Sequence, residues 1–317
     1  MKKIDIVFMG TPEFAVTILS KLLSDDSINV VGVVTAPDKP AGRGRKTHSS
    51  AVKDFAVNND LKTLQPTKLK DPEFVSELGR LNAHLFVVVA FRMLPEVVWA
   101  MPPMGTINLH ASLLPQYRGA APINWAIING EKETGVTTFF IEREIDTGDI
   151  IEQRKTVISE NMTVGELYSD LMTLGAETTL STVKKIMNGN ANGIDQDQIV
   201  SNNELLPAPK IFKIDCKVDF YKKVDSVHNF CRGLDPYPGA WSDITTDKGQ
   251  RKSVKFFETR KTSIPVEDSL RLSSDSSGIL IPCSDYYLSV GEIQLEGKRR
   301  MSFKDFIAGN DITSFNL

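Results

Sequence analysis

The sequence has no long apolar run. Its longest, such as residues 85–90, fall well below the roughly 18 residues that a membrane-spanning helix needs. The N-terminus also lacks the apolar core of a secretory signal, because Asp5 and the turn at residues 10–13 interrupt it. We therefore expect a cytoplasmic protein with no membrane partner.

Cysteine is scarce and forms no recognisable framework. Cys216, Cys231 and Cys283 are an odd number, and their spacing matches neither a disulfide scaffold nor a zinc site. We expect three packing thiols and no bound metal. The rest of the composition, 41% hydrophobic and 24% charged over 317 residues, is that of an ordinary folded protein long enough for two domains.

Glycine-rich phosphate loops are also missing. The first predicted strand ends in Gly10, but residues 10–14 read Gly-Thr-Pro-Glu-Phe and lack the further glycines that let a dinucleotide approach. Residues 41–47 contain Lys-Thr without the glycine spacing of an ATP-binding loop. Neither an NAD site nor an ATP site is predicted.

Neither sign of charge dominates the whole chain, whose net charge is −3. Residues 205–261, however, hold 12 basic and 7 acidic side chains, a local balance of +5, whereas residues 1–204 hold 20 basic and 25 acidic, a balance of −5. A local basic surface of this kind can dock one polyanion, such as a nucleic acid. The alternative is a solvated lysine-rich face.

Strands and helices alternate through the first part of the chain. The capping-box spacing of Thr163 and Glu166 opens the last helix of this part, and proline and glycine predict a loop over residues 36–46. The alternation predicts an α/β fold with a doubly wound, mostly parallel, Rossmann-like sheet, whose last two strands are antiparallel. The predicted strands are residues 4–9, 29–35, 85–90, 106–110, 135–141 and 150–157, and the predicted helices begin near Glu13, Ser50, Pro72, Ala121 and Val164.

The pattern changes after residue 188. Asn, Gly, Asp and Pro are frequent in residues 189–209, which is typical of a linker. Short β-like runs follow at residues 254–257, 279–282, 286–290 and 292–295, and they predict a small, OB-like β-barrel. We thus expect a catalytic domain over residues 1–188, a linker over 189–209 and a C-terminal domain over 210–317.

The strand at residues 106–110 carries the most informative side chains. Positions i and i+2 of a strand point to the same side, so Asn108 and His110 are expected to face one way, at the edge where open α/β sheets bind ligands. Asp146, in the turn before residue 150, could return to that edge and hold the imidazole. A structural histidine and a simple Asx turn are the alternatives.

Four blocks occur here in order along the chain: Asn-Leu-His-Ala-Ser-Leu-Leu-Pro at 108–115, Arg-Gly-Ala-Ala-Pro-Ile-Asn-Trp-Ala-Ile at 118–127, Thr-Gly-Val-Thr at 134–137 and Asp-Thr-Gly-Asp-Ile at 146–150. Together they resemble the formyltransferases that use 10-formyltetrahydrofolate. In addition, residues 8–15 and 37–44 and the length of the C-terminal part resemble the methionyl-tRNA formyltransferase family, and the resemblance spans almost the whole chain.

The resemblance implies a reaction and roles for particular residues. The formyl group of 10-formyltetrahydrofolate would pass to the α-amine of initiator methionyl-tRNA for translation initiation, with no metal, in a chain that we expect to be monomeric. The implied catalytic residues are Asn108, His110 and Asp146. The implied folate-binding residues are Phe91, Ser112, Leu113, Leu114 and Pro115, and the implied tRNA-binding residues are Arg43, Arg45, Lys46, Lys210 and Lys213.

Two departures and several rivals accompany this resemblance. Residues 90–95 and 214–220 differ from the runs expected in the family, which affects the pterin pocket and the tRNA contacts respectively. An aminosugar N-formyltransferase is expected to show Arg-Gly-Arg-Ala-Pro where this chain has Arg-Gly-Ala-Ala-Pro at 118–122. A glycinamide ribonucleotide transformylase would stop near residue 200. A formyltetrahydrofolate hydrolase and a non-enzymatic tRNA-binding protein remain alternatives.

Overall fold

The computed structural model describes residues 3–41, 46–199, 204–246, 249, 251–266, 272–310, 312 and 315–316. The chain forms two compact units. We call the first the N-terminal unit; it comprises Met1–Gly119, Gly135–Thr156 and Ser169–Pro207. The second, which we call the C-terminal unit, comprises Ala120–Thr134, Val157–Tyr168 and Ala208–Leu317.

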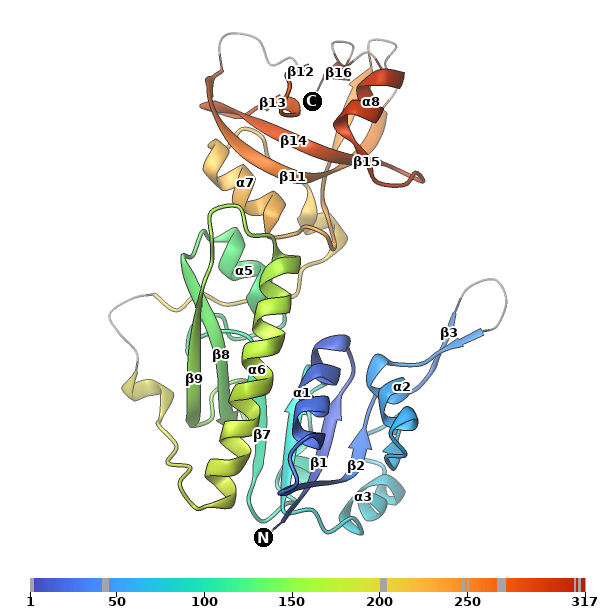
Figure 1. The fold of residues 1–317 in the computed structure, drawn as a ribbon, viewed down its shortest axis with the longest axis vertical. Helices are drawn as coiled ribbons and strands as arrows, with labels where there is room; N and C mark the ends of the chain where they lie inside the picture. The colour runs from blue at the N-terminus through green and yellow to red at the C-terminus, as the bar shows by residue number, and fades with distance from the viewer. Residues whose placement is uncertain are drawn as a thin grey trace. The chain divides into compact units, whose positions relative to one another are not determined.

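The N-terminal unit is built on a mixed sheet in the order β5-β2-β1-β6-β7-β8-β9 (Figure 1). The pairs from β5 to β7 are parallel, and β8 is antiparallel to β7. Phe140 donates its N–H to Asp149, and Thr138 contacts Glu152, so β8 and β9 run in opposite directions as expected. The strands are β1 (Ile4–Gly10), β2 (Ile28–Val34), β5 (Thr63–Leu64), β6 (Leu85–Val89), β7 (Thr106–His110), β8 (Glu133–Phe140) and β9 (Ile150–Val157).

Helices cover both faces of this sheet, which confirms the doubly wound α/β prediction. On one face α1 (Glu13–Leu23) contacts α6 (Val164–Met187), since the Thr17 hydroxyl donates to the Met172 sulfur. On the other face α3 (Pro72–Gly79) shares an apolar cluster with β1 and β6. The structure also contains α2 (Ala51–Asn58), α4 (Glu96–Trp99) and α5 (Pro122–Ile128).

Local capping signals were read correctly from the sequence. The Ser50 hydroxyl accepts the Lys53 N–H at the start of α2, and the Asp71 carboxylate accepts the Glu73 N–H at the start of α3. In the capping box of α6, Thr163 N–H donates to Glu166 Oε2 at 2.7 Å. Each cap satisfies backbone donors that the first turn of a helix leaves free.

Residues 36–46 are not a simple loop. Strands β3 (Lys39–Ala41) and β4 (Lys46–His48) pair as an antiparallel ribbon, which proline and glycine content alone did not predict. Two basic residues expected to bind tRNA, Arg43 and Arg45, lie outside the described residues.

The C-terminal unit contains an antiparallel sheet in the order β12-β13-β14-β11-β10-β16, with β15 paired to β14. Residues 286–290 and 292–295, predicted as separate strands, form the single strand β14, and β10, α7 and α8 were not predicted. The elements are η2 (Lys213–Cys216), α7 (Val224–Arg232), β10 (Ala240–Thr246), β11 (Arg251–Pro265), β12 (Ser273–Ser274), β13 (Ile279–Pro282), β14 (Tyr286–Leu295), β15 (Met301–Ser302), α8 (Phe303–Gly309) and β16 (Phe315–Asn316).

The three cysteines are packing thiols, as predicted. Cys216, Cys231 and Cys283 are all buried, free and part of the apolar core of the C-terminal unit. Burial raises the pKa of the Cys283 thiol to about 12, which keeps it neutral and unreactive. None of the described helices combines the length and the apolar character needed to cross a membrane.

Candidate active site

Strand β7 carries Asn108 and His110 to the carboxyl end of the parallel strands. Asn108 is paired with Val88 of β6, whose side chain belongs to the cluster on the α3 face. The intervening Leu109 lies against Gly175 of α6 on the opposite face. The alternation of a strand therefore places Asn108 and His110 on the same side, as the sequence predicted.

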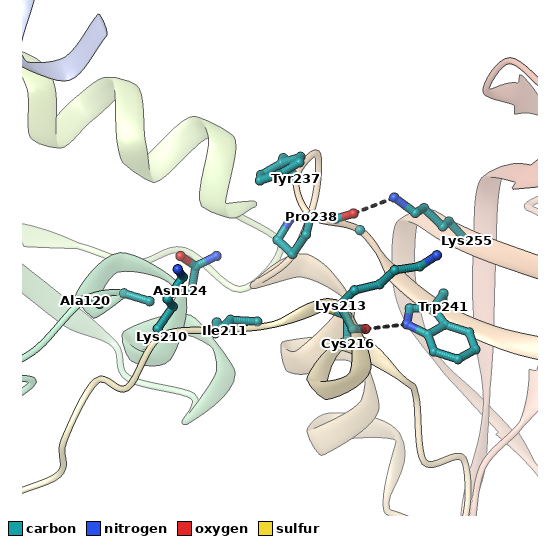
Figure 2. Close-up of a pocket in the computed structure, with 12 residues that line it drawn as sticks. Ala120, Asn124, Lys210, Ile211, Lys213, Cys216, Tyr237, Pro238, Trp241 and Lys255 are labelled. Carbon is teal, nitrogen blue, oxygen red and sulfur yellow. Dashed lines mark hydrogen bonds between the residues drawn. The ribbon is translucent and has the colours of Figure 1, made fainter. Parts of the chain in front are cut away.

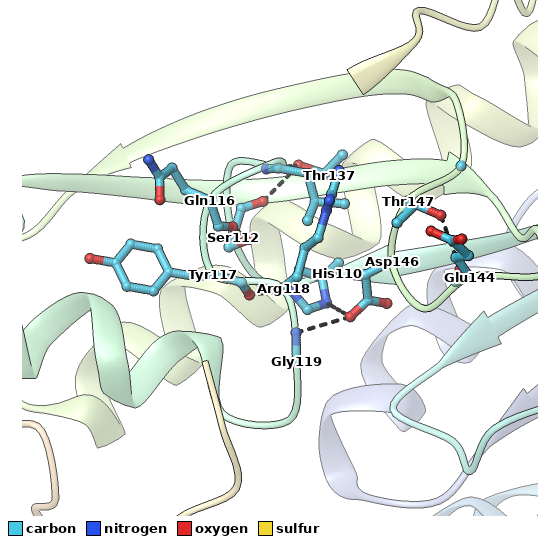
Figure 3. A network of polar contacts seen from close by, with 12 residues as sticks. His110, Ser112, Gln116, Tyr117, Arg118, Gly119, Thr137, Glu144, Asp146 and Thr147 are labelled. Carbon is cyan, nitrogen blue, oxygen red and sulfur yellow. Dashed lines mark hydrogen bonds and ion pairs between the residues drawn. The ribbon is translucent and has the colours of Figure 1, made fainter. Parts of the chain in front are cut away.

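The His110 ring lies between the Tyr117 carbonyl and the Asp146 carboxylate (Figure 3). Nε2 lies 2.8 Å from the Tyr117 carbonyl oxygen, and Nδ1 lies 3.8 Å from Asp146 Oδ2. A carbonyl oxygen only accepts, so Nε2 carries a hydrogen. The distance of 3.8 Å exceeds a hydrogen bond, which leaves Nδ1 as the ring atom available to a reacting group.

Asp146 reaches His110 from the turn between β8 and β9. Its φ of +57° lies in the left-handed region, which Asp tolerates better than most residues. Oδ2 accepts the Gly119 N–H at 3.0 Å, and the side chain is only 12% exposed. The structure thus brings His110 and Asp146 together, with Asn108 on the same face of β7.

Asn108 differs from its neighbours in having an unused amide. It is half-buried, and among the described residues no group hydrogen-bonds to its side chain. A half-buried amide without an internal partner is able to bind a ligand atom.

The loop after β7 is fixed by hydrogen bonds. Ser112 Oγ donates to the Gln116 carbonyl, Leu114 N–H donates to Thr137 Oγ1, and Gln153 Nε2 donates to the Leu114 carbonyl. Of the four loop residues predicted to border the folate, Ser112, Leu114 and Pro115 are buried and Leu113 is half-buried. The main chain of this loop is therefore held rigidly beside His110.

Phe91, the fifth predicted folate residue, is half-buried against the cluster on the α3 face. The Arg92 guanidinium lies 5.4 Å from the centre of the Phe91 ring and donates to the carbonyls of Pro66 and Thr67. Arg92 therefore fixes one side of the Phe91 ring.

The predicted tRNA residues Lys210 and Lys213 line one pocket of about 360 Å³, which lies wholly within the C-terminal unit (Figure 2). Both are exposed, and Lys210 Nζ lies 5.2 Å from the centre of the Phe212 ring. Lys255 also lines the pocket and donates to the Pro238 carbonyl at 2.6 Å. The lining contains three lysines and no acidic residue, so it favours an anion.

Two aromatic side chains complete this pocket. Tyr237 is 81% exposed between two prolines, and Trp241 Nε1 donates to the Lys213 carbonyl. Sequence reasoning missed both, as well as Lys255; the Pro-Tyr-Pro run at residues 236–238 was the available signal for Tyr237. Of the remaining predicted tRNA residue, Lys46, the structure describes only the main chain, in β4.

Sequence reasoning also missed Gln196. It lies in the predicted linker, in the short helix η1 (Gln196–Gln198), and is 1% exposed. Its amide nitrogen donates to the carbonyls of Asp146 and Gly148. The polar run Asp-Gln-Asp-Gln at 195–198 gave no sign of this burial. No cluster of three potential metal ligands occurs in the described part of the chain.

Comparisons with known proteins show which family the chain resembles. Residues 2–183 match the family described as formyl transferase, and residues 210–311 match the formyl transferase C-terminal domain. The chain is 48% identical to the methionyl-tRNA formyltransferase of Bacteroides fragilis over 99% of this chain and 98% of that protein. It is 49% identical to that of Parabacteroides distasonis over 98% and 97%.

A solved structure shares the fold at much lower identity. The N-formyltransferase of Helicobacter canadensis, crystallised with folinic acid and dTDP-3-aminofucose, superposes with a TM-score of 0.65. It is 21% identical and covers 95% of this chain and 100% of its own. The chain belongs to the formyl transferase family and, within it, to the methionyl-tRNA formyltransferases.

Proposed function

We propose that this protein transfers the formyl group of 10-formyltetrahydrofolate to the α-amine of initiator methionyl-tRNA, as a cytoplasmic monomer that supports translation initiation. The observation that carries the proposal is the His110–Asp146 pair at the carboxyl end of β7, with Asn108 on the same face. It occurs in a chain that matches its formyltransferase relatives over nearly their full length.

The reaction needs little help from a strong base. An α-amine has a pKa of about 8, so part of it is neutral and nucleophilic near neutral pH. The amine nitrogen attacks the formyl carbon and forms a tetrahedral oxyanion. The bond from that carbon to N10 of the folate then breaks, the amine nitrogen loses one proton, and N10 gains one.

The site residues divide these tasks. The free Asn108 amide donates to the oxyanion, a contribution commonly worth about 3–4 kcal/mol per well-placed donor. His110 Nε2 is tied to Tyr117, so Nδ1 acts at the reacting atoms, either accepting the amine proton or, once protonated, donating to the oxyanion. Asp146 stabilises the protonated ring and orients it.

The folate is proposed to lie along the loop of Ser112, Leu113, Leu114 and Pro115, with Phe91 lining the pterin end. The main chain of this loop is rigid, because the Leu114 N–H donates to Thr137 Oγ1 and the Leu114 carbonyl accepts from Gln153 Nε2. Gln153 Nε2 also donates to Thr137 Oγ1. Ser112 is 0% exposed, so its contribution is to shape the loop through its bond to Gln116.

The tRNA is proposed to dock through its phosphates. The pocket of Lys210, Lys213 and Lys255 supports this, because phosphate contacts from lysines supply most of the affinity for nucleic acids.

Arg43, Arg45 and Lys46 remain proposed contacts for the acceptor stem. Arg43→Ala should therefore affect tRNA kinetics and leave the folate KM unchanged.

The test is a direct assay of purified protein. Incubation with 10-formyltetrahydrofolate should formylate charged initiator tRNA, and uncharged or elongator tRNA should serve poorly or not at all. Formylation of an aminosugar nucleotide, or release of formate without an acceptor, would replace the proposal with one of its rivals. Binding of tRNA without turnover would leave a non-enzymatic binding protein.

A further inference from the structure

The segment of the N-terminal unit that follows α6 contributes a buried side chain to the candidate active site. Ile194 pairs with Ile150 of β9 through two main-chain hydrogen bonds of 2.8 and 2.9 Å. This pairing carries η1 against the turn that holds Asp146. Gln196, the first residue of η1, is thereby buried within the N-terminal unit.

The Gln196 amide uses its full hydrogen-bonding capacity. Nε2 donates to the Asp146 carbonyl at 3.0 Å and to the Gly148 carbonyl at 2.9 Å. Oε1 accepts from Arg118 Nε at 3.1 Å and from Arg118 Nη2 at 2.6 Å. A neutral amide has two donor hydrogens and two acceptor lone pairs, so all four are satisfied.

These bonds connect the two segments around Asp146: the turn that contains it and the loop that contains Arg118. Arg118 immediately precedes Gly119, whose N–H binds Asp146 Oδ2. Gln196 therefore links the main chain of Asp146 to the loop that binds its side chain. Asp146 itself has a left-handed φ, a conformation that persists where surrounding contacts fix it.

We propose that Gln196 is a positioning residue that sets the Asp146 carboxylate against His110. The inference rests on the proposed function for its kinetic consequence. Leu206, ten residues further along the chain than Gln196, supports the loop that binds His110. The Tyr117 N–H donates to the Leu206 carbonyl, and the Leu206 N–H donates to Gln116 Oε1, both at 2.8 Å. The Tyr117 carbonyl in turn binds His110 Nε2.

Gln196→Glu tests this with the smallest change of shape. A carboxylate keeps the acceptor for Arg118 but loses both donors to Asp146 and Gly148. Displacing a catalytic group by about 1 Å can cost about 10²-fold in rate. We therefore expect kcat to fall by about 10- to 100-fold, with the KM values for folate and tRNA nearly unchanged.

Gln198→Glu is the matched control, since it makes the same change in the same short helix at an exposed position. It should leave kcat and both KM values at the levels of the unmodified protein. A normal kcat in Gln196→Glu, or an equal loss in Gln198→Glu, would overturn the proposal.

A double-mutant cycle separates positioning from a general structural role. In an Asp146→Asn background, which keeps a residue type that tolerates the left-handed φ, Gln196→Glu should cause no further loss of kcat. An equal fold-loss in both backgrounds would show that Gln196 does not act through Asp146, and would overturn the inference.

Amide hydrogen exchange gives a readout that does not depend on activity. The Gly119 N–H should exchange faster in Gln196→Glu, and also in Gln196→Met, which removes all four bonds without adding charge; it should not change in Gln198→Glu. Unchanged Gly119 exchange in both Gln196 variants would refute the positioning role. Failure of the unmodified protein to formylate tRNA would refute only the proposed function.

Discussion

The two most buried histidines of the described chain, His110 and His228, show how surroundings decide what a residue does. His110 Nε2 donates to the Tyr117 carbonyl, and Nδ1 lies 3.8 Å from the Asp146 carboxylate. His228 is 0% exposed and binds the Thr259 hydroxyl and the Glu160 carbonyl. Burial, with Arg232 nearby, lowers the pKa of His228 to about 4. The first ring faces a carboxylate in the candidate active site, and the second is a neutral part of a core.

The low pKa of His228 predicts a pH dependence of stability. The unfolded histidine has an ordinary pKa of 6.5, so between about pH 6.5 and pH 4 the unfolded chain binds a proton that the folded chain does not. Stability should fall as the pH falls through this window, by at most about 3 kcal/mol from this group. Urea unfolding at pH 7 and pH 4.5 should show a larger loss for the unmodified protein than for His228→Gln; equal losses would contradict the assignment.

Asn108 is expected to act only in the transition state. Asn108→Ala removes an amide that no described residue uses, so the fold should be unaffected. If the amide binds the oxyanion, kcat should fall by about 10²-fold or more while the folate KM stays nearly constant. Steady-state kinetics check this, with the exposed Asn188→Ala as a control that should be silent. Near-native turnover in Asn108→Ala would remove Asn108 from the mechanism.

At the scale of elements, the turn between β8 and β9 is sterically constrained. It returns Asp146 to the edge where β7 ends, and Gly148 packs so closely that an added Cβ would lie 1.8 Å from the Phe140 carbonyl oxygen. No side chain fits there without moving the main chain. The turn therefore depends on glycine at this position for a steric reason.

Gly148→Ala should displace the turn and with it Asp146. We expect a loss of stability of about 2 kcal/mol or more, together with a fall in kcat, because the carbonyl bound by Gln196 must move. Thermal unfolding and kinetics measure both. Gly309→Ala, in α8 with nothing within 4 Å of the added Cβ, is the matched control and should change neither. A Gly148→Ala variant as stable and active as the control would contradict the steric argument.

At the scale of the whole molecule, the candidate active site and the pocket with three lysines belong to different units. The His110–Asp146 pair belongs to the N-terminal unit, and the pocket with three lysines belongs to the C-terminal unit. A reaction between a small folate and a large charged nucleic acid suits this division. In the proposed function, the tRNA gains affinity on the C-terminal unit while the N-terminal unit holds the reacting groups.

Lys213→Ala should weaken tRNA binding without affecting the folate. The loss of one phosphate contact should reduce the slope of log affinity against log salt by about one and raise the KM for charged tRNA. Binding titrations at several salt concentrations check the slope, with the exposed Lys298→Ala, outside the pocket, as the control. A salt slope unchanged in Lys213→Ala but reduced in Lys298→Ala would move the tRNA site away from the pocket.

The sequence by itself determined the elements that local pattern encodes. Apolar alternation predicted β7 and the shared face of Asn108 and His110, and capping residues predicted the starts of α2, α3 and α6. These signals act over a few residues, where spacing alone decides which side chains share a face. The turn before residue 150 also offered Asp146 as a partner for His110, and the family resemblance added the expected catalytic roles of all three residues.

Only the tertiary structure decided which distant segments support the pair. Gln196 binds the main chain of a residue 50 positions away, and nothing in its polar surroundings indicated that the side chain is buried. Likewise Tyr237 and Lys255 join Lys210 and Lys213 in one pocket only because the sheet of the C-terminal unit folds them together. Contacts of this kind depend on how elements pack rather than on local periodicity, and so they become visible only once the chain is folded.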